Sequence, residues 1–181
     1  MIYNKHNLAV AGIADPKSNR PEITGVFFTK DKTVATDTFS LVEVSTLKNF
    51  KTGFAGTQPM AGAKPFIVPA KQLSTIKADL LGIKHLDSQA VDLVDTNGNI
   101  NRLPRINDKF PDYETLFPGS SVKPFAEVYV NAKLLIKVLK VLGEMNDLSK
   151  VKISLYGTNK AVVLKSGSAD QEAKGLLMPM I

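Results

Sequence analysis

The chain contains the stretch NAKLLIKVLKVLG at residues 131–143, and the rest of the sequence is best understood from it. At about 100° per residue on a helix, Lys133, Lys137 and Lys140 fall within about 60° of one another. The opposite side is filled by apolar residues, namely Leu134, Leu135, Val138, Leu139, Val141 and Leu142. This pattern predicts a helix with one buried face and one stripe of lysine that is free to meet an anion.

The residues around this helix predict strands. Phe125–Val130 precedes it, and Asn131 is a residue type that caps helix N-termini. Val151–Leu155 and Ala161–Leu164 follow as alternating segments around the turn residues Gly157-Thr-Asn159. The uncharged tail GLLMPMI at residues 175–181 ends the chain, and we expect a last strand over Lys174–Met180.

The same order of elements occurs about 60 residues earlier. We predict a strand at Phe66–Val68, a helix from Pro69 to Leu81, and a hairpin of Val91–Val94 and Ile100–Leu103 around Asn97-Gly98. Two short segments recur: Lys64-Pro-Phe66 returns as Lys123-Pro-Phe125, and Val68-Pro-Ala-Lys71 returns as Val130-Asn-Ala-Lys133. The alternative is a chance similarity between two amphipathic segments.

A weaker copy of this unit begins the chain. It predicts a helix over Asn4–Ala14, ended by Pro16, and strands over Ile23–Thr29 and Thr33–Val44. Each of the three units then reads as strand, helix and about three strands. One such unit cannot bury both its helix and its sheet face, so the units must pack on one another.

Composition excludes several classes of function. Without cysteine there are no disulfides or thiolate chemistry, and no apolar run is long enough to span a membrane. The N-terminus lacks the layout of a signal peptide, and we expect a cytoplasmic protein. His6 and His85 lie in different units, and no catalytic or metal-binding motif is present, so we expect neither an enzyme nor a cofactor. The net charge of +6 is compatible with a polyanionic partner or with ordinary solvated lysines.

Four stretches, in this order, resemble the bacterial DNA polymerase sliding clamp, the β subunit of the replicase. They are Asn19-Arg-Pro-Glu-Ile-Thr-Gly25, Val34-Ala-Thr-Asp37 followed by Leu41, Phe110-Pro-Asp-Tyr113 ending in Pro118, and Leu176-Leu-Met-Pro-Met180. The chain is similar to the middle domain of that family followed by only the second half of its last domain. This implies a complete clamp-like domain over residues 1–118 and a half-domain over 119–181.

The resemblance implies an α+β clamp fold of repeated βαβββ units, with antiparallel sheets outside and helices on one side, lining a hole around duplex DNA. Lysines on those helices would contact backbone phosphates without reading sequence. The residues that this assigns to DNA binding are Lys133, Lys137, Lys140, Lys71, Lys77 and Lys5.

The resemblance also implies an apolar cleft near the C-terminus, into which polymerases and repair proteins insert a short peptide. The matching residues are Thr36, Leu41, Leu116, Asn131, Met178, Pro179 and Met180, with Val162 and Leu164 as a cleft wall. Methionine adapts to different side chains, which suits several partners. The chain departs from the family at Thr38-Phe-Ser40, where Gly-His-Arg is usual, and at its final residue, Ile181.

An odd number of units leaves one of them unpaired. We therefore expect a homo-oligomer in which terminal units pair across a two-fold axis. It is either a closed dimer that cannot encircle DNA or a tetrameric ring with twelve units. The function implied is a clamp-like processivity factor. The alternative is a protein-interaction module that keeps the docking cleft and does not encircle DNA.

Overall fold

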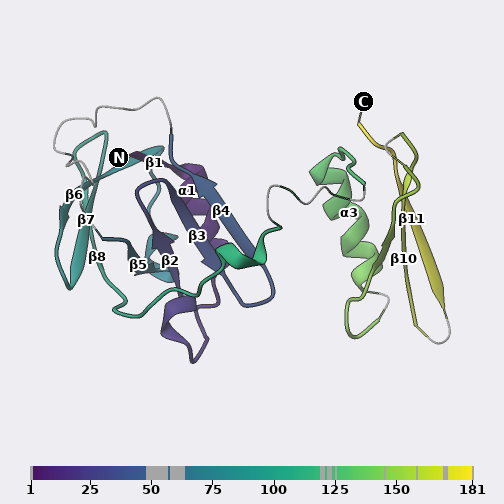
Figure 1. Cartoon of the computed structure of the whole chain (residues 1–181), viewed down its shortest axis with the longest axis horizontal. Coiled ribbons are helices and arrows are strands. Elements are labelled where there is room, and N and C mark those ends of the chain that lie inside the picture. The colour runs from purple at the N-terminus through teal and green to yellow at the C-terminus, as the bar shows by residue number, and fades with distance from the viewer. Residues whose placement is uncertain are drawn as a thin grey trace. The chain divides into compact units, whose positions relative to one another are not determined.

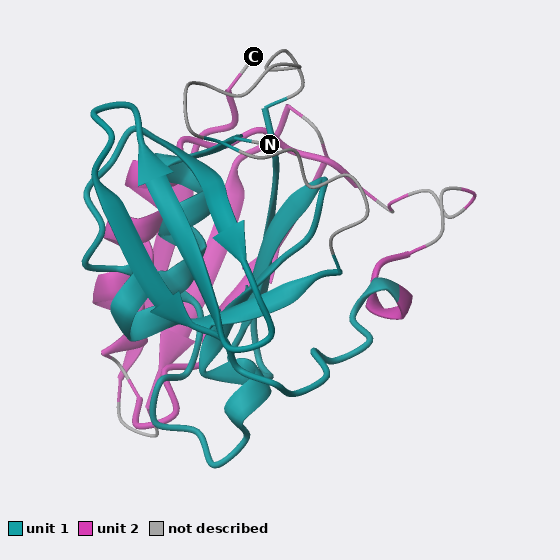
Figure 2. Cartoon of the chain, turned by 90° about the vertical axis from the view of Figure 1, so that its left-hand side faces the viewer, with its two compact units in different colours: residues 1–114 teal, residues 115–181 magenta. Residues whose placement is uncertain are grey.

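The computed structural model describes residues 2–47, 57, 64–118, 121, 124, 126–144, 146–157, 159–168 and 171–180. Lys123, Phe125, Ile181 and the stretches 48–56 and 58–63 therefore lie outside the described residues. The chain divides into two compact units, residues 1–114 and 115–181, which Figure 2 colours separately. The expected boundary was four residues later, after Pro118.

Unit 1 contains the βαβββ order twice (Figure 1). The first repeat comprises β1 (Ile2–Asn4), α1 (Lys5–Ala9), β2 (Gly25–Phe28), β3 (Lys32–Thr36) and β4 (Leu41–Ser45), with 3-10 turns at Val10–Gly12 and Pro21–Ile23. The second comprises β5 (Phe66–Pro69), α2 (Ala70–Leu73), β6 (Leu80–Leu86), β7 (Ala90–Asp95) and β8 (Ile100–Pro104). The predicted α+β class and repeated unit are confirmed.

The two repeats of unit 1 exchange their first strands. One antiparallel sheet has the order β1-β6-β7-β8 and the other β4-β3-β2-β5, so the first strand of each repeat pairs with the second strand of the other. Tyr3 lies opposite Leu81 in one sheet, and Val68 lies opposite Val26 in the other. Neither repeat completes its sheet alone, which makes unit 1 a single folding unit.

Both helices and both sheets of unit 1 share one apolar core. Phe28 is fully buried and stacks on Phe66 at 5.2 Å, and the Tyr3 ring meets it edge-on at 4.9 Å. Asn7 of α1 is buried as well, but its amide donates to the Thr33 hydroxyl and to the Val44 carbonyl. These bonds satisfy a polar group that would otherwise destabilise the core.

A second, smaller cluster covers the other face of the β2–β5 sheet. The Phe110 ring stacks on Phe27 at 4.7 Å, and Tyr113 meets Phe110 edge-on. The Lys32 ammonium lies over the Tyr113 ring at 5.1 Å and donates to Glu43 and Glu114. The pKa of Lys32 is raised chiefly by its hydrogen bond to Glu43. The Phe110–Tyr113 segment is thus fixed to unit 1.

Unit 2 contains one helix and one three-stranded sheet. After a 3-10 turn at Glu114–Leu116, α3 (Ala132–Gly143) packs on β9 (Lys152–Ser154), β10 (Val162–Gly167) and β11 (Glu172–Leu177), in the sheet order β11-β10-β9. Gly175 permits this packing, because a Cβ placed there would lie 2.6 Å from Val138 of the helix. Among the described residues of both units, no helix is long and apolar enough to cross a membrane.

The predicted helix from Pro69 to Leu81 is wrong beyond its first turn. The α-helix ends at Leu73, and Leu80 and Leu81 belong to β6, where they pair with β1. The hydroxyls of Ser74 and Thr75 donate to backbone carbonyls three residues earlier, which favours a turn over a continued helix. Strand pairing with another repeat therefore overrides the helical periodicity of this segment.

Three predicted strands also differ from the structure. Thr33–Val44 is a hairpin of β3 and β4, because the Asp37 carboxylate accepts from the backbone N–H groups of Phe39 and Ser40 and closes a turn. Ile23 lies in a 3-10 turn before β2. Residues 126–130 are assigned to no strand, since among the described residues they lack a ladder partner on one side.

Candidate functional site

The lysine stripe of α3 lies on an exposed helix face. The Asn131 side chain accepts from the backbone N–H groups of Lys133 and Leu134 at 3.0 and 3.2 Å, which confirms it as the helix cap. Lys133, Lys137 and Lys140 are all exposed, and none forms an ion pair with a described residue. Their charges are therefore available to an external anion.

The opposite side of α3 is only partly buried. Leu142 is 3% exposed, and Leu135, Val138 and Leu139 pack with it against the sheet. Leu134 and Val141, which we expected to face the core, remain 51% and 62% exposed. They flank the buried arc, which one three-stranded sheet is too narrow to cover completely.

The candidate lysines of unit 1 lie on or beside its two short helices. Lys5 begins α1, Lys71 lies in α2, and Lys77 follows α2; all three are exposed. Lys5 and Lys77, from different repeats, line one groove of about 470 Å³ together with Asp79. The exchange of first strands brings these two lysines together, although 72 residues separate them in the sequence.

A second basic row crosses the sheet of unit 2. Lys165 of β10 lies directly opposite Lys174 of β11 and Lys152 of β9. These side chains point away from α3, because Leu164, the next residue along β10, is fully buried against the helix. Like charges directly opposite in a sheet are unfavourable. This row could not be predicted from the sequence, since only the register of the three strands places the lysines side by side.

The candidate docking residues of unit 1 surround the β3–β4 turn. Thr36 is 7% exposed, and its hydroxyl donates to the Ser40 carbonyl at 2.7 Å. Leu41 is half-buried against the Phe110 cluster. The pKa of Asp37 lies below its usual value, chiefly because the Ser40 backbone N–H donates to it, helped by the Ser40 hydroxyl and the Phe39 N–H. These bonds fix the turn.

The remaining candidate docking residues belong to unit 2 and differ in exposure. Leu116, Met178 and Met180 are 76%, 65% and 55% exposed, and Pro179 is half-buried. Val162 and Leu164 are buried in the core under α3, and Val162 pairs with Leu177 at the start of the tail. The backbone N–H of Met180 donates to the Tyr129 carbonyl at 2.7 Å. The backbone of Met180 is therefore held in place.

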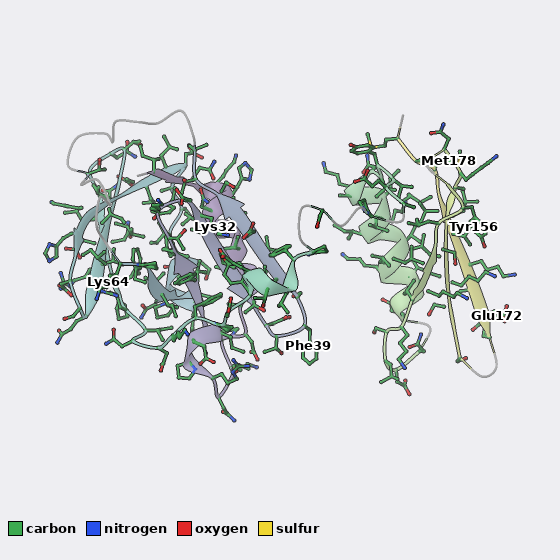
Figure 3. The ribbon with its side chains drawn as sticks, viewed as in Figure 1. Lys32, Phe39, Lys64, Tyr156, Glu172 and Met178 are labelled. Atoms are coloured by element: carbon green, nitrogen blue, oxygen red, sulfur yellow. The ribbon has the colours of Figure 1, made fainter. Side chains whose placement is uncertain are left out.

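Sequence reasoning missed Phe39 as a candidate contact. It lies at the tip of the β3–β4 hairpin, points away from unit 1 and is 97% exposed (Figure 3). The preceding residue, Thr38, has a φ of 78°, a conformation that a β-branched side chain strongly disfavours. An exposed aromatic ring beside a strained residue is typical of a contact surface.

Replacing Thr38 with glycine will stabilise unit 1 by about 1 kcal/mol, because glycine adopts a positive φ without steric cost. Chemical denaturation of the two proteins measures the difference. Thr38→Ala keeps the Cβ and should gain less. A loss of stability in Thr38→Gly would show that the threonine side chain contributes more than the strain it causes.

No family model and no curated protein sequence matches the chain. Solved structures do match. The β subunit of the DNA polymerase of Streptococcus pyogenes matches with a TM-score of 0.71 at 16% identity, over 100% of this chain and 50% of that one. The DNA polymerase sliding clamp of Bacillus subtilis gives 0.68 at 14%, over 99% and 48%.

This chain has the fold of a bacterial sliding clamp. It spans about half the length of the clamps that it matches. The archaeal PCNA of Thermococcus kodakaraensis also matches, with a TM-score of 0.57 at 14% identity, over 98% of this chain and 72% of that one. The resemblance predicted from four short motifs is thus confirmed at the level of fold.

Proposed function

We propose that this clamp-fold chain is a processivity factor that binds duplex DNA without sequence preference and docks polymerase or repair proteins at its C-terminal tail. It acts as a homo-oligomer and not as an enzyme. The observation that carries the proposal is the lysine stripe of α3, three exposed charges on one helix face with no ion-pair partner among the described residues. Regularly spaced lysines bind phosphates without reading bases, which suits a protein that must slide.

Binding of a fluorescent DNA duplex at several salt concentrations tests the DNA part of the proposal. The logarithm of the association constant should fall linearly with the logarithm of the salt concentration, as it does when counterions are released from DNA. Duplexes of unrelated sequence should bind equally well. Absence of binding at low salt would favour the alternative, a protein-interaction module without DNA binding. The exposed tail methionines are the observation that favours this second function.

The docking part of the proposal predicts that Met180→Ala weakens binding of a synthetic clamp-binding peptide about tenfold. Met180 is 55% exposed and its backbone is anchored, so a partner can cover its side chain. Calorimetry or fluorescence anisotropy measures the affinity, and removal of residues 178–181 should abolish it. Ile100→Ala, a similarly exposed apolar residue of unit 1, is the control. Equal affinities for all the proteins would remove the tail from the proposal.

A further inference from the structure

Unit 1 shows what the first strand of a repeat requires. β5 pairs with β2 of the other repeat along one edge, through residues 66–69 and 25–28. At its other edge, the Ile67 carbonyl of β5 accepts a hydrogen bond from the Ile106 N–H of the same repeat at 2.9 Å. β1 likewise pairs with β6, so each repeat of unit 1 supplies a first strand to the other.

The segment 126–130 of unit 2 has the same place in the order of its repeat as β5 has in the second repeat of unit 1. It directly precedes Asn131 and α3, as β5 directly precedes α2, and Val130-Asn-Ala-Lys133 matches Val68-Pro-Ala-Lys71. The bond from Met180 to Tyr129, at 2.7 Å, repeats the bond from Ile106 to Ile67. In β5, one edge pairs with β2. Among the described residues, the corresponding edge of the segment 126–130 has no partner strand.

The alternation of an extended backbone identifies the groups at that open edge. The Tyr129 carbonyl points toward Met180, so the backbone groups of Val128 and Val130 point the other way. The side chains of these two valines pack toward the core of unit 2, while Tyr129 is 80% exposed on the outer face. The open edge of the segment therefore carries the N–H and C=O groups of Val128 and Val130, and the side chains of these two valines lie on its core-facing side.

β9 presents the complementary edge. It pairs with β10 along one side, whereas the equivalent second strands of unit 1, β2 and β6, are paired on both sides. Ile153 of β9 lies opposite Leu164 on the face of the sheet that packs against α3. Because β9 is an edge strand, Ile153 remains 53% exposed. Thirteen of the sixteen large hydrophobic side chains exposed among the described residues lie in residues 115–181.

We propose that unit 2 completes itself with a second copy of this chain: residues 126–130 of one protomer pair antiparallel with β9 of its partner, and the reverse pairing occurs across a two-fold axis. The occupant is a second copy because unit 2 carries both complementary edges, and such a self-complementary surface closes a dimer. The short stretch between Glu114 and α3 has no room for another repeat of about 60 residues. The inference deepens the homo-oligomer part of the proposed function.

Proline scanning of the open edge tests the pairing. Val128→Pro removes an N–H that points to the partner, and light scattering should give one chain of 19.6 kDa where the wild type gives twice that mass. Glu127→Pro is the matched control and should stay dimeric, because its N–H lies on the same side as the Tyr129 carbonyl and points away from the open edge. A monomeric wild type at micromolar concentration, or a folded Val128→Pro protein that remains dimeric, would overturn the proposal.

Cysteine cross-linking gives a second readout that does not depend on folding of a proline variant. The chain has no cysteine, and the side chains of Tyr129, Lys152 and Ser154 all lie on the outer face. A mixture of Tyr129→Cys with Lys152→Cys or Ser154→Cys proteins should form a disulfide heterodimer on mild oxidation, detected by mass spectrometry. Lys174→Cys, two strands farther away on β11, should not.

The outcomes separate this interface from DNA binding. If both β9 cysteines fail to cross-link to Tyr129→Cys while the wild type is dimeric, the copies meet through another surface and the strand pairing is wrong. Cross-linking of Lys174→Cys as readily as the β9 positions would contradict it equally. Cross-linking that succeeds in a protein without DNA affinity would support the pairing and remove only the DNA part of the proposed function.

Discussion

Replacing Lys133, Lys137 and Lys140 together with glutamate will reduce the affinity for duplex DNA by at least about 100-fold at low salt. All three lysines are exposed on one face of α3, and none forms an ion pair with a described residue. The replacement therefore converts three phosphate contacts into three repulsions. The slope of affinity against salt concentration should fall by about three, since each lost contact removes about one released counterion.

The row formed by Lys152, Lys165 and Lys174 provides the matched control. These lysines belong to the same unit, and their triple replacement by glutamate changes the net charge by the same amount on the opposite face. We expect DNA affinity to change much less than in the helix variant. If both triple variants lose affinity equally, net charge and not the α3 stripe determines binding.

Phe110→Ala will lower the free energy of unfolding of unit 1 by about 3–5 kcal/mol. Phe110 is 6% exposed, its ring stacks on Phe27, and the Tyr113 ring meets it edge-on. Loss of the Phe110 ring therefore leaves a cavity between the sheet and the segment 110–113. Urea denaturation measures the effect. Phe39→Ala, at a position 97% exposed in the same unit, should change stability by less than about 0.5 kcal/mol.

A Phe110→Ala protein as stable as the wild type would mean that the segment is not fixed to unit 1. Loss of stability without loss of secondary structure is the expected result, because Val34, Ile67 and Ile106 remain in the cluster.

Elements that depend on local signals could be predicted from the sequence. The helix at 131–143 combines a strong periodicity with an Asn131 cap, and Asn97-Gly98 forms its turn with Gly98 at a φ of 85°. The segment 69–81 could not be predicted, because its helical periodicity competes with a strand whose partner lies in the other repeat. The repeat predicts a short first strand before α1, and its three residues form β1 by pairing with β6.

The candidate site was predictable only in part. The lysines of α3 follow from a helical pattern, whereas the row across the sheet requires the register of three strands. Leu134 and Val141 lie in the predicted apolar arc, but a three-stranded sheet does not cover them. The resemblance implies that Val162 and Leu164 form a cleft wall, whereas both are buried in the core under α3.

The bond between the Met180 N–H and the Tyr129 carbonyl joins the tail to the segment 126–130, through which we expect copies to associate. A peptide that binds the tail and a second protomer that binds residues 126–130 therefore act on neighbouring backbone. By thermodynamic linkage, each will alter the affinity of the other by the same factor. Peptide affinities measured across the monomer–dimer transition should accordingly vary with protein concentration, which makes dilution a probe of communication between the two surfaces.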